Sequence, residues 1–73
     1  MQIYQIRIKE LRTDNDYTQE QIANYLGIKQ TVYSRYETGK NDMKIEYLVK
    51  LANFYGVSAD YILGLRKGLS WPR

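Results

Sequence analysis

The sequence predicts an all-α fold built from five short helices. The one proline among the 73 residues is Pro72, so no earlier position is barred from a helix by a missing amide. Apolar residues recur at intervals of three and four, as they do on one face of a helix, and no segment keeps the two-residue alternation of a strand. A chain of this length makes one compact domain with a small core.

The first helix is expected over about residues 3–13, and the polar run "TDND" follows it as a turn. The second helix has the clearest start signal in the chain. Thr18 is a favourable N-cap, and Gln21 stands three residues later, where it completes a capping box. Gly27 then supplies the residue that tolerates the left-handed conformation at a helix end.

The third helix is expected over residues 29–38, with Gly39 after its end. Its start is weaker, because the side chain of Lys29 cannot accept a hydrogen bond from the free amides of the first turn. At about 100° per residue, Tyr33 and Tyr36 fall on one side of this helix and small polar or basic residues fall on the other. We therefore expect both tyrosines to be buried and the polar side to face solvent or a partner.

The fourth helix is expected over residues 45–55, with Gly56 after its end and Asp42 as a candidate N-cap. Its inward stripe is predicted to comprise Ile45, Leu48, Val49, Ala52 and Tyr55. A short fifth helix should begin after the N-cap Ser58 and end near Leu63. The last nine residues, "LRKGLSWPR", lack a periodic pattern.

The composition excludes several classes of function. The chain has no cysteine and no histidine, which leaves no disulfide framework, no thiolate or imidazole metal site and no ready general base near neutral pH. It also lacks a glycine-rich phosphate loop, so we expect no enzyme activity, no metal and no cofactor. No apolar run approaches the ~20 residues that span a bilayer, and a cytoplasmic protein is expected. The formal net charge of +3 favours a polyanionic partner.

The link between the second and third helices is very short. Gly27 and Ile28, with about one flanking residue on each side, separate them, which forces a steep crossing of about 90–120°. The stretch "TQEQIANYLGIKQTVYSRYETGK" (residues 18–40) closely resembles the helix-turn-helix of the Cro and repressor family of phage and bacterial regulators. "IEYLVKLANFYGVSADYILG" (residues 45–64) resembles the fourth and fifth helices of that family.

The resemblance extends over roughly residues 7–65 and implies a lambda-repressor-like domain over residues 1–65, with its helix-turn-helix at about 18–38. It further implies sequence-specific binding of double-stranded DNA by a transcriptional regulator of the repressor type. In such proteins the second helix of the motif enters the major groove. The positions that would touch base edges are Gln30, Thr31, Ser34 and Arg35.

Glutamine can pair with adenine at N6 and N7, and arginine can pair with guanine at O6 and N7. The resemblance also implies that Gln19 holds a phosphate and braces Gln30. Contacts to the DNA backbone, which position the protein without reading sequence, are expected from Thr18, Gln19, Lys29, Thr38 and Lys40. Lys44 is a further candidate for such a contact.

Two other positions follow from the resemblance. Relatives often carry an arginine in the first helix that pairs with a glutamate late in the recognition helix, and here these are Arg12 and Glu37, in a structural role. The family commonly has an aliphatic residue at the position of Tyr33, whose hydroxyl needs a partner or a path to solvent.

The partner and assembly leave alternatives open. One domain of this size offers few base contacts, so a homodimer that reads a near-palindromic operator is expected, at least on DNA. The rival interpretation is an antitoxin or protein-interaction module, whose main partner is another protein. Leu69 and Trp71, in the tail of residues 66–73, are the candidate interface for either kind of protein contact.

Overall fold

The computed structural model describes residues 2–64, and this part of the chain contains five α-helices joined by short loops. They are α1 (Ile3–Asp14), α2 (Gln19–Leu26), α3 (Gln30–Glu37), α4 (Ile45–Tyr55) and α5 (Ala59–Leu63). The predicted all-α class is confirmed, and each predicted helix lies within one residue of its observed bounds. The proposed tail at 66–73, with Leu69 and Trp71, lies outside the described residues.

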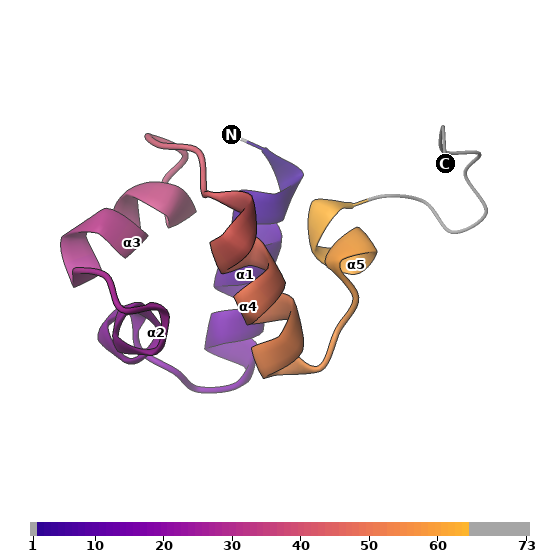
Figure 1. The fold of residues 1–73 in the computed structure, drawn as a ribbon, viewed down its shortest axis with the longest axis horizontal. Helices are drawn as coiled ribbons and strands as arrows, with labels where there is room; N and C mark the ends of the chain where they lie inside the picture. The colour runs from indigo at the N-terminus through magenta and orange to yellow at the C-terminus, as the bar shows by residue number, and fades with distance from the viewer. Residues whose placement is uncertain (1, 65–73) are drawn as a thin grey trace.

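The helices pack around one hydrophobic core, and Figure 1 shows how they are arranged. In that view α1 and α4 occupy the middle, α2 and α3 lie to one side, and α5 lies to the other. Every helix contributes a side chain that is at most 1% exposed: Ile8, Ile22, Tyr33, Leu51 and Ile62. None of the helices in residues 2–64 has the length and apolar character needed to cross a membrane.

The start and end of α2 follow from local chemistry. The Thr18 hydroxyl accepts a hydrogen bond from the amide of Gln21 at 3.1 Å, and the Gln21 side chain accepts one from the amide of Thr18 at 2.8 Å. Gly27 ends the helix with φ of 76°, in the left-handed region that a residue without Cβ enters most easily. These caps fix where α2 stops and therefore where the turn into α3 begins.

The predicted inward stripe of α4 is wrong at two positions. Ile45 is 67% exposed and Val49 is 47% exposed, whereas Leu51, which the stripe omitted, is fully buried. The buried face is centred on Leu48, Leu51 and Ala52, because α4 packs between helices on two sides and its inward direction is rotated from the one that spacing suggests. Periodicity identified the helix but misjudged its rotation by part of a turn.

The expectation that Asp42 caps α4 is also wrong. Lys44 occupies the N-cap position, and its side chain makes no capping hydrogen bond. The loop before it is held from elsewhere, because the amide of Met43 donates to the hydroxyl of Tyr4 on α1 at 2.9 Å. A tertiary contact, and not a local cap, therefore holds the backbone just before α4.

Candidate nucleic-acid interface

The turn between α2 and α3 is tight and well anchored. The amide of Ile28 donates to the carbonyl of Ala23 at 3.0 Å, and Ala23 is fully buried. An alanine here lets the two helices approach closely, since it adds only one methyl group between them. The turn is therefore held by a backbone hydrogen bond and by close packing of α2 against α3.

Two buried tyrosines set the rotation of α3. Tyr33 is fully buried and Tyr36 is 6% exposed, which confirms the prediction for both. Their rings meet edge to face with centroids 6.4 Å apart. Because this side of α3 is held in the core, the opposite side must point away from the molecule.

The predicted base-reading residues lie on that outward side. Gln30, Thr31 and Arg35 are exposed, and Ser34 is half-buried. All four belong to α3, within one and a half turns of each other. They form a continuous polar surface, which we call the α3 face: Gln30, Thr31, Ser34 and Arg35.

The predicted backbone-contacting residues flank the α3 face. Thr18 and Gln19 lie at the start of α2, Lys29 precedes α3, and Thr38 and Lys40 follow it. Gln19 is half-buried and the other four are exposed. This arrangement places hydrogen-bond donors and two positive charges beside the α3 face.

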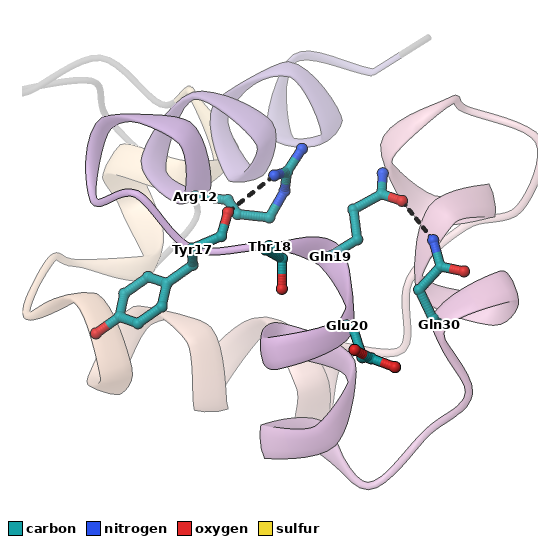
Figure 2. Close-up of a pocket in the computed structure, with 6 residues that line it drawn as sticks. All are labelled: Arg12, Tyr17, Thr18, Gln19, Glu20 and Gln30. Atoms are coloured by element: carbon teal, nitrogen blue, oxygen red, sulfur yellow. Dashed lines mark hydrogen bonds between the residues drawn. The ribbon is translucent and has the colours of Figure 1, made fainter.

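An open hollow lies where α1, α2 and α3 meet (Figure 2). Its volume is about 590 Å³, and it is lined by Arg12, Tyr17, Thr18, Gln19, Glu20 and Gln30. Figure 2 shows Gln19 and Gln30 reaching toward each other across it. The Nε2 group of Gln30 donates to Oε1 of Gln19 at 2.6 Å, which joins the first residues of the two helices.

A family model described as "Helix-turn-helix" matches residues 8–62. The chain belongs to this helix-turn-helix family. The match contains α2, α3 and α4 in full and most of α1 and α5. It confirms the resemblance to Cro- and repressor-type regulators that residues 18–40 carry.

The helix-turn-helix chain is similar to several curated proteins. It is 42% identical over 57 residues to the SPbeta prophage-derived uncharacterized HTH-type transcriptional regulator YonR of Bacillus subtilis, which covers 78% of this chain and 53% of that protein. It is 40% identical over 55 residues to the cryptic phage CTXphi transcriptional repressor RstR of Vibrio cholerae, covering 75% and 50% of the two chains. The chain thus spans about half the length of these relatives.

A solved structure shares the arrangement of the helices. It is a transcriptional regulator from Listeria innocua, with a TM-score of 0.84 and 23% sequence identity. The alignment covers 100% of this chain and 68% of that one. This similarity establishes the arrangement of the helices.

An ion pair joins α3 to α1. Nε and Nη2 of Arg12 donate to the two carboxylate oxygens of Glu37 at 2.7 and 3.0 Å. Nη1 of Arg12 also donates to the carbonyl of Tyr17 at 3.0 Å, drawn in Figure 2. The Glu37 side chain is 2% exposed, so this two-bonded pair is shielded from water.

The surroundings of Glu37 shift its proton affinity. Burial alone would raise the pKa of Glu37, but hydrogen bonds from Arg12 and Gln19, the adjacent Tyr33 hydroxyl and the Arg12 charge together bring it below its ordinary value. Burial, followed by the nearby Glu37 charge, raises the pKa of Tyr33 and Tyr55. Both hydroxyls are buried and have no partner in hydrogen-bonding geometry among residues 2–64, so Tyr33 influences Glu37 without a well-formed bond.

Stability should decrease in acid through Glu37. Because the pKa of Glu37 is lower in the folded state than its ordinary 4.5, the unfolded chain takes up the proton first as the pH falls. The stabilisation is complete above pH 4.5 and is lost as the pH falls through the folded pKa. Urea unfolding should show that the free energy of unfolding falls more steeply between pH 7 and pH 3 for the wild type than for Glu37→Gln. Parallel curves for the two proteins would contradict this assignment.

Sequence reasoning missed two residues that hold the loop after α3. Gln5 is 1% exposed, and its Nε2 group donates to the carbonyl of Asn41 at 2.9 Å. With Tyr4 it ties α1 to the loop that carries Lys40. A signal was present, because Gln5 stands three residues before Ile8 on the inward face of the first helix, where a polar side chain needs a buried partner.

Proposed function

We propose that this chain binds double-stranded DNA in a sequence-specific manner and acts as a transcriptional regulator of the repressor type. The observation that carries the proposal is the orientation of α3. Burial of Tyr33 and Tyr36 turns the α3 face outward. Hydrogen bonds from Gln30 to Gln19 and from Arg12 to Glu37 hold the two ends of the helix. An outward α-helix with short polar and basic side chains fits the major groove of B-DNA.

Each residue of the α3 face has a role in this proposal. Gln30 pairs with adenine, offering an amide oxygen to N6 and an amide hydrogen to N7. Arg35 pairs with O6 and N7 of guanine. The hydroxyl of Thr31 or Ser34 can serve either kind of base, and the Thr31 methyl can contact the methyl group of thymine.

The flanking residues hold the DNA backbone. Thr18 and Gln19 at the start of α2 contact phosphates of the DNA backbone. The free amides and the helix dipole at this N-terminus also favour an anion. Lys29, Thr38 and Lys40 add contacts at the two ends of α3. These contacts set the position of the protein on DNA, and the α3 face reads the sequence.

A gel shift on random duplex DNA at increasing salt tests the proposal. For a DNA-binding protein, the logarithm of the binding constant falls linearly with the logarithm of the salt concentration, because binding releases counterions from the phosphates. In vitro selection of bound sequences should then yield a defined site. Absence of binding at low salt would overturn the proposal and favour a protein-interaction module of the antitoxin kind.

Replacing Lys40 with alanine should weaken binding to all sequences alike and lower the salt slope by about 1. Lys40 is exposed in the loop that Tyr4 and Gln5 hold, so the substitution removes a charge without disturbing the core. Titrations at several salt concentrations measure the slope. Lys50→Ala removes an equal charge from α4, outside the helix-turn-helix, and should leave the slope unchanged.

The proposal includes a homodimer on DNA in the cytoplasm. Four reading residues per chain define a short site, and two copies related by a twofold axis would read a near-palindrome with half-sites about 34 Å apart. Exposed apolar side chains of Ile3, Ile6 and Tyr61 lie on α1 and α5, and a second copy there would leave α3 free (Figure 1). Sedimentation of the protein with its selected site tests this, and one copy per site would overturn it.

A further inference from the structure

We propose that Glu37 is a positioning residue for base reading, because its carboxylate fixes the amide orientation of Gln19 and, through Gln19, that of Gln30. The inference rests on the DNA-binding function proposed above and assigns Glu37 a role beyond its ion pair. The contacts form one chain across three helices: Arg12 on α1, Glu37 on α3, Gln19 on α2 and Gln30 at the start of α3.

This series of hydrogen bonds starts at the Glu37 carboxylate, a group that can only accept. The Glu37 carboxylate is an acceptor only, and Arg12 holds both of its oxygens. Its Oε1 atom accepts a second hydrogen bond, from Nε2 of Gln19 at 3.0 Å. With its side chain 2% exposed, the carboxylate has little water to replace that donor.

The carboxylate dictates which way the Gln19 amide turns. In the reverse orientation the Gln19 carbonyl oxygen would lie 3.0 Å from a carboxylate oxygen, where two acceptors repel each other. The amino group of Gln19 therefore faces Glu37, and its Oε1 atom faces Gln30. Gln19 thus presents a hydrogen-bond acceptor to Gln30.

The same reasoning fixes the exposed atoms of Gln30. The Gln19 oxygen can only accept, so Gln30 must turn its amino group toward it, and the bond is 2.6 Å long. The Oε1 atom of Gln30 and one Nε2 hydrogen remain free at the start of the α3 face. One acceptor and one donor match N6 and N7 of adenine. Charge on Glu37 therefore sets the base preference of a residue at the opposite end of α3.

Glu37→Gln tests the inference, because a neutral amide can donate or accept and no longer dictates the orientation of Gln19. The base pair read by Gln30 is first identified as the position where Gln30→Ala loses discrimination. Competition binding with single-base variants of the selected site should show that Glu37→Gln reduces discrimination at that pair about tenfold. Discrimination at the pair read by Arg35 should be unchanged.

Two matched variants separate positioning from the structural role of the ion pair. Arg12→Lys weakens the ion pair but leaves the Glu37 charge and its bond with Gln19, so base preferences should be retained. Gln19→Met keeps the ion pair but removes the hydrogen bonds that connect Glu37 to Gln30. It should therefore reproduce the loss of discrimination at the base pair read by Gln30. Gln19→Met also removes a proposed phosphate contact, which weakens binding to all sites by a common factor without changing discrimination. The inference is overturned if Glu37→Gln or Gln19→Met leaves discrimination at the Gln30 pair unchanged, or if Arg12→Lys causes the same selective loss.

A readout without DNA keeps this inference separate from the proposed function. In two-dimensional NMR of the free protein, the side-chain amide protons of Gln30 should resonate apart from those of solvent-exposed glutamines. Gln19→Met and Glu37→Gln should both move them toward exposed values, whereas Arg12→Lys should not. Exposed values already in the wild type would overturn the inference. Failure of the wild type to bind DNA would instead overturn the proposed function.

Discussion

Replacing Arg12 with methionine should destabilise the fold by about 3–5 kcal/mol at neutral pH. The substitution removes two hydrogen bonds to Glu37 and leaves a carboxylate whose side chain is 2% exposed without its counter-charge. A domain of this size has a free energy of unfolding of about 4–11 kcal/mol in total. The expected loss is therefore a large fraction of the total free energy of unfolding, and urea titration followed by circular dichroism measures it.

The double variant Arg12→Met/Glu37→Leu is the matched control. An apolar pair of similar volume removes the unpaired charge as well as the ion pair, so most of the lost stability should return. The penalty of the single variant should also shrink in acid, where Glu37 takes up a proton. Equal stability losses for the single and double variants would mean that packing, and not the charge, accounts for the effect.

Replacing Arg35 with alanine should cost about 1–3 kcal/mol of binding on the selected DNA site and relax the preference at one base pair. Arg35 is exposed in the last turn of α3, so its removal should leave the free energy of unfolding nearly unchanged. Its planar guanidinium can form two parallel hydrogen bonds with O6 and N7 of guanine, a geometry that the flexible ammonium group of a lysine matches less well.

The measurement is a set of dissociation constants for the selected site and its single-base variants. Arg35→Ala should bind the selected site and the site changed at one pair with similar affinity. Lys40→Ala is the comparison, because loss of a phosphate contact weakens all sites by the same factor. If both variants lost affinity uniformly, the division between base-reading and backbone-contacting residues would be wrong.

Local signals in the sequence were sufficient for the five helices and the turn at the centre of the motif. The Thr18–Gln21 capping box and Gly27 define α2, and the positions of Tyr33 and Tyr36 define the buried side of α3. These signals act within one or two turns of a helix, so they can be read from neighbouring residues. The outward direction of the α3 face followed from them.

The tertiary structure decided the features that depend on distant residues. Ile45 and Val49 are exposed because the neighbours of α4, and not its own spacing, set the face that is buried. The bond from Gln19 to Glu37 joins residues 18 positions apart, and the bond from Gln5 to Asn41 joins residues 36 apart. Spacing along one helix cannot specify such contacts, because they arise only when separate helices pack and bring unpaired polar groups together.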